Sequence, residues 1–331
     1  MKMKQKRMRK IGIASALGLV VLVVLGLYGA SNYMLNYSLN YPKEERMTAE
    51  HWKNRMKNEC PWMIGWMDSV YQHHCVKDTF VTMPSGYKAH AIYLYAPKTT
   101  EKTAVVVHGY QVRSEGMLHI AYLYNHDMGY NVLLPDLYGH GESEGDHIQM
   151  GWKDRWDVIR WSEIANEIFR VKGEDRRAKN TLQVIHGISM GASTTMAVSG
   201  EKTPDYVKCF VEDCGYTSVW DEFRGELKAQ YGLPAFPLLH VASRLCKQEY
   251  GWDFREASAL EQVRKCTLPM LFIHGDADSY VPTWMVYPLY EAKPEPKELW
   301  IVPGSAHAMS YKDYPQEYTE HVKKFVGKYI R

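Results

Sequence analysis

The feature that most constrains this chain is a Gly-x-Ser-x-Gly pattern at residues 187–191, with Ser189 at its centre. The apolar residues 182–185 before it predict a buried strand, and the small residues 192–198 after it predict a helix. A serine in such a sharp turn projects its hydroxyl beyond the strand, where the N–H groups of the helix N-terminus face it. The pattern also fits an ordinary turn whose serine caps the helix, so the rest of the chain must decide between the two.

The first forty residues predict a membrane anchor. Six basic and no acidic side chains lie within residues 1–10, and residues 11–30 carry no charge. Twenty apolar residues in a helix span about 30 Å, which matches the hydrocarbon core of a bilayer. The alternative is a cleaved signal peptide, but its apolar region is usually only about 7–15 residues long, so we expect a retained anchor. The basic flank predicts a cytoplasmic N-terminus, with the bulk of the chain outside the cytoplasm.

Charge argues against nucleic acid as a partner. The 331 residues have a formal net charge of +2, so the chain beyond the six basic residues of the tail carries 2 − 6 = −4. That balance leaves no broad basic surface of the kind that nucleic-acid binding needs.

Metal and cofactor sites are not expected. His73, His74 and Cys75 are adjacent, and neighbouring residues in regular structure seldom converge on one ion. The segment after Ser189 lacks the lysine and the spacing of a phosphate-binding loop, so no nucleotide is expected either. Six cysteines are too few for a disulfide scaffold, although Cys60 and Cys75 could pair in an oxidising compartment.

From residue 79 onward the pattern predicts an α/β domain. Two strands around a Pro-Ser-Gly turn should form an antiparallel hairpin, and the later alternation of apolar runs with amphipathic helices indicates a mostly parallel sheet covered on both faces. The expected strands lie at 79–83, 90–96, 104–107, 131–134, 182–185, 206–211, 270–273 and 298–302, and the main helices at 115–128, 152–171 and 318–330.

The expected organisation has three parts. Residues 1–42 form the basic tail, anchor and stem, residues 43–78 a leading segment that is helical over 48–71, and residues 79–331 the main domain. Within the last part the alternation stops over 214–268, where aromatic residues and prolines gather. This stretch is expected to form a small helical lid, or else a long helical connection without substrate contact.

Residues whose side chains or backbone can take part in catalysis follow several predicted strands. Asp278 comes after strand 270–273, His307 after strand 298–302, and His108-Gly109-Tyr110 after strand 104–107. The carboxyl ends of parallel strands share one edge of a sheet, so these groups should gather around Ser189. A serine hydroxyl needs a base to take its proton, and the base needs an acid to orient it.

Two other carboxylates compete with Asp278 for the role of the acid. Asp276 is two residues away but is expected to lie in the turn, and Asp213 ends the strand at 206–211. We give Asp278 preference. Histidines 108, 186 and 274 each precede a glycine at a strand end and are expected to make structural hydrogen bonds, and His140 should shape a loop beneath the Ser189 turn.

Taken in order, these motifs resemble those of the serine hydrolases of the α/β-hydrolase superfamily. The resemblance covers residues 79–331 and includes the segment Asp136–Ser143 and the segment Gly304–His307 beside the motifs above. It implies Ser189 as nucleophile, His307 as general base and then acid, and Asp278 as the residue that orients His307. It also implies an oxyanion hole formed by the backbone N–H groups of Tyr110 and Met190. The anchored chain resembles bacterial cell-surface hydrolases more than secreted lipases, and it lacks the His-Gly-Gly-Gly loop of many lipases and esterases.

We therefore expect a membrane-anchored serine hydrolase that cleaves a small carboxylic ester through an acyl-serine intermediate, without a cofactor. A peptidase or amidase and an acyltransferase use the same triad and remain alternatives, and so does a non-catalytic surface protein that keeps the fold for binding.

Overall fold

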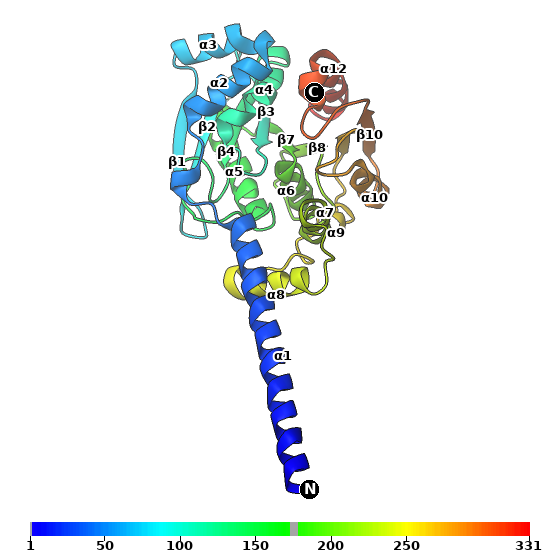
Figure 1. Ribbon diagram of the computed structural model, residues 1–331. Coiled ribbons are helices and arrows are strands. Elements are labelled where there is room, and N and C mark those ends of the chain that lie inside the picture. The colour runs from blue at the N-terminus through cyan, green and yellow to red at the C-terminus, as the bar shows by residue number, and fades with distance from the viewer. Residues whose placement is uncertain (1, 173–177) are drawn as a thin grey trace. The chain divides into compact units, whose positions relative to one another are not determined.

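The computed structural model describes residues 2–172 and 178–331. The chain divides into two compact units. The larger comprises Tyr41–Glu222 and Ala257–Arg331, and the smaller comprises Met1–Asn40 and Phe223–Glu256. Figure 1 shows the course of the chain through both. This division differs from the expected one, which had its boundaries at residues 42, 78, 214 and 268. The leading segment belongs to the larger unit, and only the middle of the expected lid belongs to the smaller unit.

The larger unit is built on an eight-stranded sheet. Its strands are β1 (Lys77–Thr82), β2 (Lys88–Leu94), β3 (Lys102–Val107), β4 (Asn131–Asp136), β7 (Leu182–Ile188), β8 (Val207–Asp213), β9 (Met270–Gly275) and β10 (Lys297–Val302). The order across the sheet is β1-β2-β4-β3-β7-β8-β9-β10. β1, β2 and β4 pair antiparallel, and every pair from β4 to β10 is parallel. The predicted hairpin and the mostly parallel sheet are therefore confirmed, and a separate two-stranded sheet, β5 (Val171–Lys172) with β6 (Ala178–Lys179), was not expected.

Helices cover both faces of this sheet. On one face α5, α6, α9 and α10 pack on one another in that order and contact β3, β7, β8 and β9. The other helices of the larger unit include α4, on which α2 and α3 pack, and α12, which contacts β8. The helices are α2 (Ala49–Glu59), α3 (Ile64–Gln72), α4 (Leu118–Tyr122), α5 (Asp154–Phe169), α6 (Met190–Ser199), α9 (Ala259–Val263), α10 (Val286–Ala292), α11 (Ser310–Asp313) and α12 (Pro315–Tyr329).

Strand residues divide between these layers with the two-residue period of β-structure. On β3, Ala104 and Val106 join one large apolar cluster with residues of α2, α4 and α12, whereas Val105 and Val107 are buried outside that cluster. Because successive side chains point to opposite faces, a strand covered on both sides is apolar at every position. This is why short continuous runs of Val, Ile and Leu marked the strands in the sequence.

The expected helix at 115–128 is a composite. A 3₁₀ turn at Ser114–Met117 leads into α4, which continues as a π-type turn over Leu123–Asp127. The suggestion that Cys60 and Cys75 pair is wrong: all six cysteines are free, and Cys60 is buried whereas Cys75 is exposed on the chain after α3.

The smaller unit contains α1 (Lys2–Leu39) and α8 (Leu238–Tyr250), and α7 (Val219–Tyr231) begins in the larger unit and ends in the smaller one. α1 packs on α8, and the Ser31 hydroxyl donates to the Leu238 carbonyl at 3.1 Å. Residues 3–39 of α1 are long and apolar enough to cross a membrane, and the side chains over 11–25 are exposed. By length and composition this helix can be either an anchor or a signal sequence.

Candidate active site

Ser189 occupies a turn that only small neighbours permit. It has φ 58° and ψ −122°, and its N–H donates to the Asp213 carbonyl at 2.8 Å. A Cβ on Gly187 would lie 2.0 Å from the Gly191 carbonyl oxygen, and a Cβ on Gly191 would lie 2.2 Å from the Val107 carbonyl oxygen. Strand β7, the turn and helix α6 can therefore approach this closely only with glycine at both positions.

The Ser189 hydroxyl meets a histidine and an aspartate that follow two other strands. Its Oγ lies 2.8 Å from His307 Nε2, and His307 Nδ1 lies 2.7 Å from Asp278 Oδ2. The second oxygen of Asp278 accepts from the N–H groups of Tyr280 and Val281, each at 3.0 Å. The parallel strands β7, β9 and β10 thus bring together three residues that are up to 118 positions apart in sequence.

Asp278 is held in its charged form. Burial raises the pKa of this carboxyl, but hydrogen bonds from His274 and His307 outweigh burial and hold the pKa below its usual value. His274 Nε2 also lies 2.9 Å from the Val281 carbonyl oxygen. It therefore supports the loop after β9 that carries Asp278, as expected for a structural histidine. A buried, ionised carboxylate at Nδ1 fixes the tautomer that leaves Nε2 of His307 free to accept a proton.

Neither competing carboxylate occupies this position. Asp276 accepts from the Gly304 N–H at 2.6 Å and lies in the turn, as expected. Asp213 accepts from the Tyr318 hydroxyl at 3.0 Å and from the Ser310 hydroxyl at 3.3 Å, and burial raises its pKa to about 6. The carboxylate that accepts the hydrogen bond from His307 Nδ1 belongs to Asp278.

The segment expected to form the oxyanion hole lies beside Ser189. An ideal Cβ on Gly109 would stand 3.4 Å from the Ser189 Cβ, and Tyr110 follows directly in the pocket wall. His108 fixes this segment, since its Nδ1 donates to the Gly109 carbonyl at 2.8 Å and its Nε2 accepts from the Leu137 N–H at 2.9 Å. Met190 is the first residue of α6, where backbone N–H groups have no partner within the helix.

The segment that begins at Asp136 supports the same loop. Asp136 is fully buried, and its carboxylate accepts from the Ser114 N–H at 2.7 Å, the Glu142 N–H at 2.9 Å and His90 Nδ1 at 2.7 Å. Burial raises the pKa of Asp136, but the His90 contact outweighs burial and holds the pKa well below its usual value. This motif therefore ties the loop after β3 to the end of β4 rather than touching the Ser189 hydroxyl.

His140 and His186 also have structural partners. His140 is fully buried, bonds the Tyr138 carbonyl at 2.9 Å, and packs its ring 4.8 Å from the His108 ring. His186 lies between the hydroxyls of Tyr124 at 3.1 Å and Tyr318 at 3.0 Å. Burial lowers the pKa of His186 to about 3, so it stays neutral.

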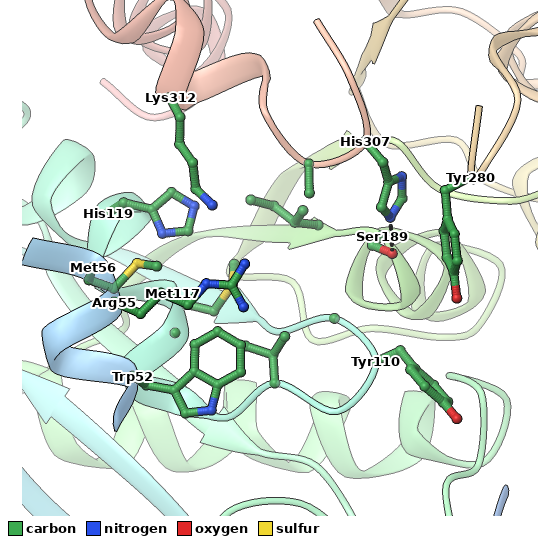
Figure 2. A pocket seen from close by; sticks show the side chains of 15 residues that line it. Trp52, Arg55, Met56, Tyr110, Met117, His119, Ser189, Tyr280, His307 and Lys312 are labelled. Carbon is green, nitrogen blue, oxygen red and sulfur yellow. Dashed lines mark hydrogen bonds between the residues drawn. The ribbon is translucent and has the colours of Figure 1, made fainter. Parts of the chain in front are cut away.

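A pocket of about 220 Å³ opens beside Ser189 and His307. Figure 2 shows Ser189, His307 and Tyr280 at one side of it, and residues of α2 and α4 with Lys312 of α11 at the other. Sequence reasoning missed these latter residues because nothing in the pattern connects α2 to the loops after β9 and β10. The residues concerned are Trp52, Arg55, Met56, His119 and Lys312.

One group of potential metal ligands occurs among the described residues. Cys214, Asp278 and His307 place one atom each within 4.8 Å of one another. Burial holds the pKa of the Cys214 thiol well above its usual value, and a thiol must lose its proton to ligate. Asp278 and His307 are also hydrogen-bonded to each other, so this set fits a hydrogen-bonded acid–base pair better than an ion.

Comparisons with known proteins agree on the architecture. The model of the prolyl oligopeptidase family matches residues 117–331. An uncharacterised protein of Bacillus subtilis, YqkD, is 31% identical over 252 residues, which make up 76% of this chain and 80% of that protein.

Two solved structures illustrate the likeness. An esterase of Pyrococcus furiosus has a TM-score of 0.61 at 20% identity, over 77% of this chain and 92% of that one. A puromycin-hydrolysing peptidase of Mycobacterium tuberculosis has a TM-score of 0.59 at 19% identity, over 77% of this chain and 39% of that one. At such identities the structures are evidence of a shared fold alone.

Proposed function

The chain belongs to the prolyl oligopeptidase family and is a serine hydrolase with the α/β-hydrolase fold, and on this basis we propose that it cleaves a small carboxylic ester. The observation that carries the proposal is a chain of two hydrogen bonds that links Ser189, His307 and Asp278. Ser189 Oγ lies 2.8 Å from His307 Nε2, and His307 Nδ1 lies 2.7 Å from Asp278 Oδ2. These distances fit direct proton transfer between nucleophile and base.

Each residue has one role in the proposed reaction. His307 Nε2 removes the proton from Ser189 Oγ as the hydroxyl attacks the substrate carbonyl, and Asp278 stabilises the imidazolium that forms. The N–H groups of Tyr110 and Met190 donate hydrogen bonds to the carbonyl oxygen and stabilise the negative charge that develops on it. His307 then protonates the leaving alcohol. In the second half of the reaction His307 removes a proton from a water that attacks the acyl-Ser189, and it returns that proton to Ser189 Oγ as the acyl bond breaks and the carboxylic acid leaves.

Two considerations bear on the choice between ester and peptide. The pocket of about 220 Å³ is below the usual range for drug-sized ligands, which favours a compact substrate. The family to which the chain belongs carries a peptidase name, and this supports a short peptide or amide as the second candidate. The same triad serves both reactions, so the substrate is decided by the pocket.

The direct test compares substrates on the detergent-solubilised full chain. We expect hydrolysis of 4-nitrophenyl esters, fastest for short acyl chains, and loss of that activity in Ser189→Ala. The 4-nitroanilides of single amino acids and dipeptides provide the peptidase comparison. Turnover of the anilides at a kcat/KM above that of the esters would reverse the assignment in favour of the peptidase.

We further propose that α1 is a retained anchor that spans the membrane over residues 11–30. The basic tail and the uncharged, exposed segment that follows it support a cytoplasmic N-terminus and an external hydrolase domain. Protease added to intact cells should remove the domain together with known external proteins. Survival of the domain while those markers are lost would contradict this topology.

A further inference from the structure

The far side of the candidate active-site pocket carries two positively charged side chains. Arg55 of α2 and Lys312 of α11 both line it, and each contacts Glu59, which lies one turn beyond Arg55 on α2. Arg55 Nε is 2.6 Å from Glu59 Oε1, and the Lys312 ammonium pairs with Glu59 Oε2. Two cations therefore share one carboxylate, and this end of the pocket keeps a net charge of about +1.

Both cations retain unused donors. A guanidinium has five N–H groups and an ammonium three. Within residues 2–172 and 178–331, the Arg55 guanidinium makes its hydrogen bond through Nε, and the Lys312 ammonium makes its own to Glu59. The terminal nitrogens of Arg55 and the remaining protons of Lys312 are thus available to a group in the pocket.

The two cations are positioned differently, since the Arg55 side chain is 48% exposed and rests on an aromatic ring, whereas the Lys312 side chain is mostly buried. The Arg55 guanidinium lies 5.0 Å from the centre of the Trp52 ring, and the Trp52 side chain is itself buried. The Lys312 side chain is only 11% exposed, so its charge is poorly screened by water. In Figure 2 both side chains stand on the side of the pocket opposite Ser189 and His307.

The other residues around these cations add no negative charge. His119 is 96% buried, and burial together with the nearby Lys312 ammonium keeps its pKa well below the usual value, so the ring is neutral. The pocket lining also includes the apolar side chains of Met56, Val112, Met117, Ile188 and Ala308. The pocket therefore combines the Ser189–His307 pair on one side, two cations on the other, and apolar side chains in its lining.

From this arrangement we infer that the substrate of the proposed hydrolase is itself an anion. It carries a carboxylate, separated from the scissile carbonyl by a short apolar stretch, and Arg55 and Lys312 bind that carboxylate by charge-assisted hydrogen bonds. The inference rests on the proposed function, because it names the class of substrate for the same site. It makes Arg55 and Lys312 specificity-determining residues.

The test uses matched ester pairs in which methylation of one carboxylate removes its charge. For a carboxylate on the acyl side the pair is mono-4-nitrophenyl adipate and 4-nitrophenyl methyl adipate. For a carboxylate on the leaving group the pair is 4-carboxyphenyl butyrate and 4-(methoxycarbonyl)phenyl butyrate. The readout is the ratio of kcat/KM for the charged and neutral members, corrected for spontaneous hydrolysis, and the pair that responds identifies the side of the scissile bond.

Substitutions in both directions sharpen the readout. Arg55→Met and Lys312→Met should each lower the ratio by about tenfold or more in one of the two pairs. Glu59→Gln should raise it, because removal of the competing carboxylate leaves both cations to the substrate. Lys57→Met is the matched control, since Lys57 lies on the same helix but pairs with Asp68 at 2.7 Å and is not among the pocket residues, so its ratio should equal that of the wild type.

The outcomes separate this inference from the proposed function. Turnover of the neutral esters with ratios that none of these substitutions changes would overturn the inference and leave the esterase intact. If no ester is turned over, the proposed function fails. The inference is then tested by protection from fluorophosphonate labelling. Adipate should slow the labelling of the wild type but not of Lys312→Met, and dimethyl adipate should slow neither. If adipate and its dimethyl ester act alike, or if both proteins respond alike to adipate, the inference is overturned.

Discussion

Gly191 offers a sharp test of how backbone packing sets the geometry of the candidate site. Gly191→Ala adds one methyl group whose carbon would lie 2.2 Å from the Val107 carbonyl oxygen and 2.6 Å from the His108 carbonyl oxygen. Both oxygens belong to backbone, so no side chain can rotate away. The chain at the end of β3 continues directly into Gly109 and Tyr110, which are the expected oxyanion segment.

The size of the effect follows from the displacement needed. Contacts of a Cβ below 3.0 Å are essentially never seen, so α6 and the end of β3 must separate by about 0.8 Å. Added volume in a tight site costs about 1–3 kcal/mol of folding free energy, which a domain of this size tolerates. A misplacement of about 1 Å in a catalytic arrangement can cost about 100-fold in rate. We therefore expect a folded variant whose kcat/KM for a short 4-nitrophenyl ester falls by about 100-fold.

The matched control is Gly327→Ala. Gly327 lies in α12, and a Cβ there would meet nothing within 4 Å. Alanine is a better helix former than glycine by about 1 kcal/mol, so this variant should be slightly more stable and fully active. Urea unfolding followed by circular dichroism measures stability, and ester hydrolysis measures activity. An activity of Gly191→Ala within threefold of the wild type would refute the claim that this contact sets the oxyanion geometry.

Two further predictions concern single carboxylates. Asp278→Asn should fold but lose roughly 10⁴-fold in kcat, because an amide beside Nδ1 favours the wrong tautomer of His307. A decrease in kcat of less than tenfold in steady-state ester hydrolysis would argue for another acid. Asp154 is fully buried, and burial, assisted by the charge of Asp157, raises its pKa to about 8. The folded state then binds a proton that the unfolded state releases above about pH 4, so the unfolding free energy should fall as the pH rises from about 4 to about 8. In urea titrations at a series of pH values Asp154→Asn should flatten that decline, and an unchanged slope would contradict the assignment.

Much of the fold followed from local pattern. The eight strands of the main sheet were all expected because strands covered on both faces form short apolar runs, and the antiparallel hairpin was marked by its Pro-Ser-Gly turn. The strand-end positions of Ser189, Asp278 and His307 followed from the same pattern, since the carboxyl ends of parallel strands meet at one edge. Their hydrogen-bonded arrangement is the geometry that such an edge allows.

The parts that sequence reasoning missed depend on packing between distant segments. Nothing in the spacing of Arg55 or Lys312 indicates that α2 and α11 face the same pocket, because 257 positions separate the two residues and the contact depends on how α2 packs. The change from 3₁₀ to α to π geometry around α4 likewise follows from packing and not from residue preference. The pairing of Cys60 with Cys75 was expected only from the number of cysteines and from the oxidising compartment. Neither argument says how far apart the two residues lie, and a disulfide requires a short distance between them.

Covalent trapping tests whether Ser189 is a nucleophile that His307 activates. The detergent-solubilised full chain is treated with a fluorophosphonate, digested, and analysed by mass spectrometry beside Ser189→Ala and His307→Ala. We expect one phosphonylated peptide that contains Ser189, labelling at least about 100-fold slower in His307→Ala, and no labelling of that peptide in Ser189→Ala. An unlabelled Ser189 in a folded wild-type chain, or equal labelling without His307, would contradict it.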